Sequence, residues 1–226
     1  MKSETELKFL KLLRKSPKSK EEIKEVQRLA DLFSEELSME TKDLIDELKS
    51  VGLTIFSIWD LVNTKEPYPE AIDILIKHVS KQYHDKNREG IFRALAVKEA
   101  RGKANTPLLV EYNKIPIEKN NLRWVIGNTI YVIITPKDIQ NILQIVEDKA
   151  NGLSRSRFVS ALGKMQSEKA EYALIKLLDD NEMILNALQA LVRMKSKKSK
   201  EKILLLLDNP DILVKKEAQR ALKKLG

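Results

Sequence analysis

A short pattern recurs along this chain at intervals close to 30 residues, and it restricts the folds that the chain can adopt. Each copy has a small residue followed by a large aliphatic one, within a segment whose apolar residues recur every three or four positions. The five pairs are Ala94-Leu95, Thr129-Ile130, Ala161-Leu162, Ala190-Leu191 and Ala221-Leu222. Successive small residues are 35, 32, 29 and 31 positions apart. Self-similarity at this period predicts stacked helical repeats.

The composition agrees with a folded helical chain. Its 226 residues are 42% hydrophobic and 33% charged, with seven Gly and seven Pro, and the alternation typical of strands is nearly absent. Residues 123–134 are rich in β-branched and aromatic residues, so propensity alone would assign them to a strand. Their place in the repeat register instead predicts a buried helix. The sequence therefore predicts an all-α fold.

The pattern divides the chain into an irregular first part and a regular array. Residues 1–66 are predicted to form an N-terminal helical cap and an irregular first repeat, with a short helix inserted within 53–67. Helices are expected over 4–15 and 20–34, the second beginning at a capping box of Ser19 and Glu22. Residues 67–226 are predicted to form about five helix pairs that continue one solenoid. The pairs are 69–81 with 87–101, 105–115 with 120–134, 137–148 with 153–165, 167–179 with 182–195, and 199–208 with 212–225.

Cysteine usage and apolar runs indicate the cellular compartment in which the protein is expected. There is no Cys, which removes disulfides, thiolate metal sites and cysteine nucleophiles and suits a reducing compartment. The first 20 residues carry scattered charges rather than the apolar core of a signal peptide, and no apolar run approaches the ~20 residues that span a bilayer. A cytoplasmic location without membrane association is expected.

The positive charge is concentrated in the last third of the chain. Residues 151–226 hold 16 basic and nine acidic side chains, which gives +7 of the total net charge of +8. Such a region can attract an acidic protein, a nucleic acid or an anionic membrane surface. Lysines that solubilise exposed helix faces are the plainer explanation.

The repeat resembles the HEAT-repeat family. Each unit has a helix, a turn containing Asp or Asn, and a second helix with Val-Lys or a related pair near its start and Ala-Leu further on, as in LLLLDNPDILVKKEAQRALKKLG at 204–226. The resemblance covers roughly residues 68–226. The stretch from Trp59 to Asn128 is also similar to a set of bacterial HEAT-repeat proteins. This resemblance implies a right-handed α-α superhelix, the HEAT-repeat solenoid, and no particular reaction.

The resemblance implies a structural role for one column of basic residues. Six positions before the small residue of each pair, four of the five units carry Arg or Lys, and Ile184 interrupts the column. The basic members are Arg88, Arg123, Arg155 and Lys215. In HEAT arrays a basic residue here commonly pairs with acids or carbonyls of a turn and joins one repeat to the next. These four residues are therefore expected to form a structural ladder.

A second column is polar although the helices around it are apolar. It lies one position before each pair and, in a HEAT stack, would face the concave surface, because the second helices line that surface. The column and the basic residues that flank it are Arg93, Asn128, Arg157, Ser160, Lys164, Gln189, Arg193, Lys216 and Arg220. Extended concave surfaces are what solenoids use for binding, so these residues are the predicted binding site. An ordinary solvated face would show the same column.

No arrangement of residues indicates catalysis or a bound metal. His78 and His84 are the only histidines, and neither lies in a zinc-binding spacing. The seven glycines are dispersed and form no phosphate-binding loop. The sequence therefore predicts no catalytic residue, no metal site and no cofactor.

The leading hypothesis is a non-enzymatic scaffold or adaptor that binds a partner protein through a concave, basic surface. The alternative is a nucleic-acid binder. A HEAT-like class of alkylpurine DNA glycosylases uses Asp with Trp, and Trp59-Asp60 is the pair that invites this comparison. The aromatic content, 5%, is low for a protein that stacks on the bases of nucleic acid. A core role for Trp59 is the plainer explanation. A third hypothesis is support of another enzyme's assembly, as in the HEAT-like bilin lyases.

Overall fold

The computed structural model describes residues 3–226, and every regular element among them is a helix. These residues form two compact units, the first ending at Ala94 and the second running from Leu95 to Gly226. The all-α prediction is confirmed. The boundary predicted after residue 66 lies inside the first unit, and residues 1 and 2 of the predicted cap lie outside the described residues. Within residues 3–226, no helix combines the length and the apolar character needed to cross a membrane.

The first unit contains seven helical segments. They are α1 (Glu4–Arg14), α2 (Lys20–Glu40), α3 (Lys42–Ser50), α4 (Ile58–Asn63), η1 (Pro69–Ala71), α5 (Ile72–His78) and α6 (Asp85–Ala94). The predicted capping box is present at the start of α2, where the Ser19 hydroxyl accepts the Glu22 N–H at 3.2 Å and Glu22 accepts the Ser19 N–H at 2.9 Å. The predicted end of this helix at residue 34 is wrong. No Gly or Pro stands between 34 and 40, so α2 continues to Glu40.

The segment inserted between α3 and α5 forms one short helix, α4, as expected. Ser57 and Asp60 cap its first turn, since the Asp60 carboxylate accepts the Phe56 and Ser57 N–H groups at 2.7 and 2.9 Å. The buried side chains of Ile58 and Leu61 hold α4 against α6. The insertion is thus anchored in the first unit through its apolar side.

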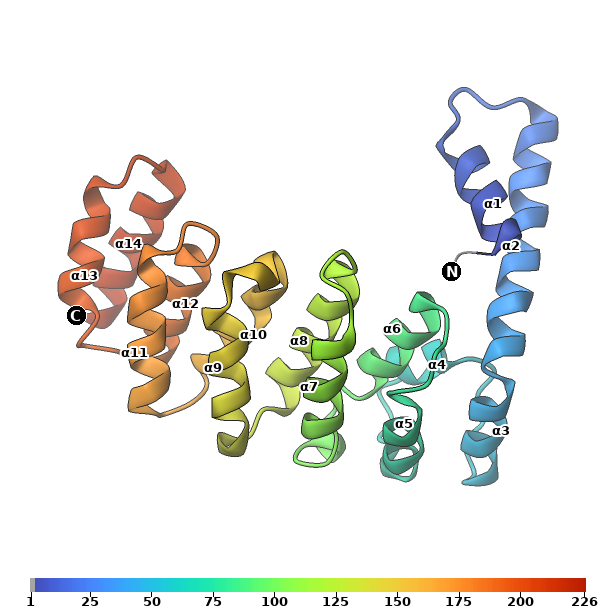
Figure 1. Cartoon of the computed structure of the whole chain (residues 1–226), viewed down its shortest axis with the longest axis horizontal. Helices are drawn as coiled ribbons and strands as arrows, with labels where there is room; N and C mark the ends of the chain where they lie inside the picture. The colour runs from blue at the N-terminus through green and yellow to red at the C-terminus, as the bar shows by residue number, and fades with distance from the viewer. Residues whose placement is uncertain (1–2) are drawn as a thin grey trace. The chain divides into compact units, whose positions relative to one another are not determined.

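The second unit consists of paired helices, which lie side by side in chain order (Figure 1). Its elements are η2 (Lys98–Ala100), α7 (Asn105–Lys114), α8 (Asn120–Ile133), η3 (Pro136–Asp138), α9 (Ile139–Glu147), η4 (Lys149–Arg155), α10 (Ser156–Leu162), α11 (Glu168–Lys176), η5 (Leu177–Asp179), α12 (Ile184–Met194), α13 (Lys200–Leu205), η6 (Leu206–Asp208) and α14 (Ile212–Leu225). The β-prone run at 123–134 forms α8, so the repeat register outweighed local propensity. Burial of Val125, Ile126, Ile130 and Ile133 explains this result.

The helices of the second unit form two layers. The second helix of each pair contacts the second helix of the next, so α8, α10, α12 and α14 make one layer, here called the second-helix layer. The first helices α7, α9, α11 and α13 pack against it. The small residues of the register, Thr129, Ala161, Ala190 and Ala221, are at most 2% exposed. Their small size lets successive helices approach closely within this layer.

Candidate binding site

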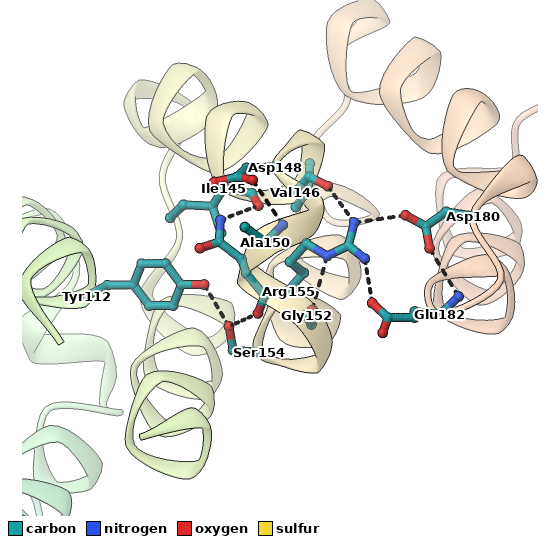
Figure 2. Close-up of polar contacts among 11 residues, drawn as sticks. Tyr112, Ile145, Val146, Asp148, Ala150, Gly152, Ser154, Arg155, Asp180 and Glu182 are labelled. Atoms are coloured by element: carbon teal, nitrogen blue, oxygen red, sulfur yellow. Dashed lines mark hydrogen bonds and ion pairs between the residues drawn. The ribbon is translucent and has the colours of Figure 1, made fainter. Parts of the chain in front are cut away.

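Arg155 connects two successive repeats of the second unit (Figure 2). It ends η4 and is 1% exposed. Its Nη1 donates to Asp180 Oδ2 and its Nη2 to Glu182 Oε2, both at 2.8 Å, and these acids lie in the turn between α11 and α12. Its guanidinium also donates to the carbonyls of Val146 and Gly152. Every nitrogen of this buried cation therefore has an acceptor.

The contact between Arg155 and Asp180 changes the ionisation of both groups. Burial disfavours the charge on each, but their mutual hydrogen bond and attraction outweigh it. The pKa of Arg155 is therefore raised and the pKa of the Asp180 carboxyl is lowered. Both groups remain charged at neutral pH, so this connection between repeats is a buried ion pair.

Arg123 makes the equivalent contact one repeat earlier, with a neutral partner. Its Nη2 donates to the Asn151 side-chain oxygen at 2.5 Å, and Asn151 stands four positions before Arg155 as Asp180 stands four before Ile184. The Arg123 guanidinium lies 4.1 Å from the centre of the Tyr112 ring, a cation–π contact. Tyr112 in turn hydrogen-bonds Ser154 at 2.7 Å (Figure 2). Arg123 and Asn151 also line a cavity of about 520 Å³ beside the α7–α8 connection.

The other two residues of the predicted ladder have different surroundings. Arg88, in the first unit, is buried, with Nη1 4.0 Å from Asp85 Oδ1 and its guanidinium over the Phe92 ring. Lys215, on α14, is only half-buried. Ile184, which occupies the same register position one repeat before Lys215, is an apolar core residue.

Three of the predicted binding residues meet at one aromatic ring. Tyr131, in the last turn of α8, has Lys164 Nζ 4.3 Å, the Arg157 guanidinium 4.6 Å and the Arg193 guanidinium 5.4 Å from its ring centre. Arg157 also lies 5.5 Å from the Trp124 ring. We call Tyr131, Arg157, Lys164 and Arg193 the Tyr131 cluster. Its members come from α8, α10, the turn after α10, and α12, and so span three successive second helices.

The cations of this cluster have no carboxylate partner within residues 3–226. Lys164 donates one hydrogen bond, to the Tyr131 carbonyl at 2.6 Å, and an ammonium has three donors. The pKa of Lys164 is lowered, first by burial and then by repulsion from Arg193, Arg101 and Arg157. Arg157 Nε is buried and has no hydrogen-bond acceptor. The cluster is thus a concentration of positive charge with which no carboxylate of the described residues pairs.

A cavity of about 360 Å³ adjoins the cluster. Lys164 and Arg101 line it together with apolar side chains, including Val132, Ile134 and Met165. The cavity thus combines positive charge with an apolar wall.

The remaining predicted binding residues are not part of the cluster. Asn128 and Ser160 are half-exposed, and the Ser160 hydroxyl donates to the Ser156 carbonyl of its own helix. Gln189 and Lys216 are exposed, and Arg220 pairs with Glu217 at 3.3 Å. Arg93 belongs to the first unit and pairs with Glu89 at 2.8 Å.

Sequence reasoning missed Tyr131, Trp124 and Arg101. Lys164 and Arg193 both stand three positions after the small residue of their unit, whereas Tyr131 stands two positions after Thr129 and Trp124 five before it. The two rings therefore do not belong to the repeated column of residues. The available signal was aromatic residues in α8, the segment that aligns with the basic helices 153–165 and 182–195.

The histidines and the Trp59-Asp60 pair contact residues of the first unit. His78 Nδ1 is 2.6 Å from the Tyr83 hydroxyl, and His84 Nε2 is 3.1 Å from Glu6. Trp59 lies against Gly90 of α6, and Asp60 caps α4. The two backbone hydrogen bonds lower the pKa of Asp60. Within residues 3–226 no three His, Cys, Asp or Glu side chains are grouped so that they could hold a metal ion.

The structure is similar to the designed armadillo repeat protein YIII(Dq)4CqI, with a TM-score of 0.46, 17% identity, and coverage of 97% of this chain and 99% of that one. No curated protein matches the chain. The model of the family described as HEAT repeats matches residues 139–226, which contain α9 to α14. The part of the chain from residue 139 to residue 226 therefore belongs to the HEAT-repeat family.

Proposed function

We propose that this protein is a non-enzymatic adaptor that binds a partner protein through the second-helix layer of its second unit. The observation that carries the proposal is the Tyr131 cluster, in which three cations converge on one ring and pair with no carboxylate of residues 3–226. Repeat proteins of this kind bind partners along the surface that their stacked helices provide. Arg and aromatic residues are the side chains that most often dominate the free energy of such interfaces.

Binding is favoured over catalysis by the roles of the titratable side chains. Asp60 caps a helix and Asp180 holds Arg155, so these two carboxylates, whose pKa values are lowered, have structural partners. The cluster presents two arginines and one lysine, which are side chains suited to recognition of an acidic surface.

Photo-crosslinking from defined positions tests the proposal. Gln189 lies one helical turn before Arg193 on the same face of α12, and Tyr172 is 72% exposed on the first helix α11. A photoreactive amino acid at Gln189 should give one discrete crosslinked protein in an extract of the cells that make this chain, and the same group at Tyr172 should not give that product.

Charge removal supplies the control for the crosslinking. The product from Gln189 should be lost in an Arg157→Gln/Arg193→Gln variant and kept in a Lys169→Gln/Lys176→Gln variant, which removes two exposed charges from α11. Circular dichroism checks that both variants stay folded. Equal crosslinking from both positions, or a product that does not depend on Arg157 and Arg193, would contradict the proposed function.

A further inference from the structure

We propose that the Tyr131 cluster and its adjoining cavity bind an acidic peptide segment, in which Asp or Glu residues flank an apolar side chain. This inference rests on the proposed function and specifies the chemistry of the partner. Arg157, Lys164 and Arg193 would hold the carboxylates, and the cavity beside Lys164 would take the apolar side chain.

The arrangement of charges is the first argument. Arg157, Lys164 and Arg193 gather at one ring although their charges repel, and Arg101 adds a fourth charge close to Lys164. Carboxylates lie beside the buried Arg155, whereas no carboxylate of residues 3–226 pairs with the cations of the cluster. A carboxylate from another molecule would offset the repulsion and supply an acceptor for the buried Arg157 Nε.

The open hydrogen-bonding capacity is the second argument. Lys164 uses one of its three donors on the Tyr131 carbonyl, and no hydrogen bond joins the guanidinium of Arg157 or Arg193 to an acceptor within residues 3–226. Guanidinium groups present paired donors that match the two oxygens of a carboxylate. The cluster therefore offers several donors within one small area, which suits two or more closely spaced acidic side chains.

The cavity is the third argument, and it separates a peptide from a nucleic acid. Val132, Ile134 and Met165 give it an apolar wall, while Lys164 and Arg101 give it a charged edge. Single-stranded nucleic acids need exposed aromatic faces on which bases stack. The Tyr131 ring already has three cations of the chain around it, and Trp124 is half-buried beneath Arg157. An apolar side chain between carboxylates fits this surface better than a base and its phosphate.

Fluorescence anisotropy with short labelled probes tests the inference. The probes are a peptide of alternating Glu and Leu, the same peptide with Gln in place of Glu, and a single-stranded oligonucleotide of the same net charge. We expect the Glu peptide to bind the full chain, the Gln peptide to bind about tenfold more weakly or less, and the affinity for the Glu peptide to fall between about 50 and 150 mM NaCl.

Variants locate the binding. Arg157→Gln/Arg193→Gln should weaken binding of the Glu peptide about tenfold or more, and Lys169→Gln/Lys176→Gln should leave it within about twofold. Equal affinity for the Glu and Gln peptides, equal loss in both variants, or tighter binding of the oligonucleotide would overturn the inference. If Gln189 still crosslinks a partner in a cluster-dependent way while the Glu peptide does not bind, the acidic-segment inference fails and the proposed function stands.

Discussion

Arg155 Nη1 lies 2.8 Å from Asp180 Oδ2, and through this buried contact the turn before α12 is held to the repeat before it. The same position one repeat earlier pairs Arg123 with the neutral Asn151. The second unit thus joins adjacent repeats by one structural device with two chemistries, an ion pair and a charge–amide hydrogen bond. The difference makes the two connections separately testable.

Removing the charge of Arg155 should destabilise the second unit strongly. Arg155→Ala leaves Asp180 buried without its partner, and such a change costs about 3–5 kcal/mol of the free energy of unfolding. Urea denaturation followed by circular dichroism measures the loss. Arg220→Ala is the control, since Arg220 is exposed and pairs with Glu217 of its own helix α14, and it should change stability by no more than about 0.5 kcal/mol. Similar losses in both variants would contradict the role assigned to Arg155.

The Arg155–Asp180 pair should also make stability depend on acid pH. The pKa of Asp180 is lowered in the folded state, so its ionisation adds stability above the unfolded pKa of about 3.9. This stability is lost as the pH falls through the lower folded pKa. Asp180→Asn removes the titration, so the free-energy gap between wild type and variant should be largest near neutral pH and shrink below about pH 4. A gap that stays constant from neutral to acid pH would show that Asp180 is not the group responsible.

Gly163 is required for the close approach of α10 and α12. A Cβ added there would lie 2.7 Å from Ala190 Cα and 2.8 Å from the Ala190 carbonyl oxygen, so the backbone must move. Gly163→Ala should therefore lower the free energy of unfolding by about 1–3 kcal/mol. Gly127→Ala is the matched variant, because its nearest obstacle, at 2.9 Å, is the Phe158 ring, which is a side chain. We expect a smaller loss there, and thermal unfolding of both variants measures the order.

Lys164 should titrate below an ordinary lysine, whose pKa is about 10.4. Burial is the main cause and repulsion from Arg193 the next, so Arg193→Gln should move the pKa of Lys164 back upward. An acidic peptide bound at the cluster should raise it as well, because a carboxylate favours the charged ammonium. NMR of the Lys164 ε-methylene group through a pH series follows both changes. An unchanged pKa in Arg193→Gln would mean that Arg193 does not act on Lys164.

The repeat register predicted most of the fold and some residues of the candidate site. It predicted that residues 123–134 form a buried helix against their local propensity, as α8 does. Burial of one face at a fixed period is a stronger constraint than the preference of single residues. The register also singled out Arg157, Lys164 and Arg193 as candidates. It did not give the end of α2 or the boundary between the two units, since both depend on packing.

The sequence by itself determined an all-α chain of stacked helix pairs, with a pattern that resembles HEAT repeats over roughly residues 68–226. Only the tertiary structure decided that Tyr131 gathers Arg157, Lys164 and Arg193, and that Arg155 has two acidic partners while Arg123 has Asn151. The physical reason is that periodicity fixes the face of a helix on which a residue lies. The distance between side chains on neighbouring helices depends on how closely those helices stack, as at Gly163 and Ala190, and a single sequence does not contain that distance.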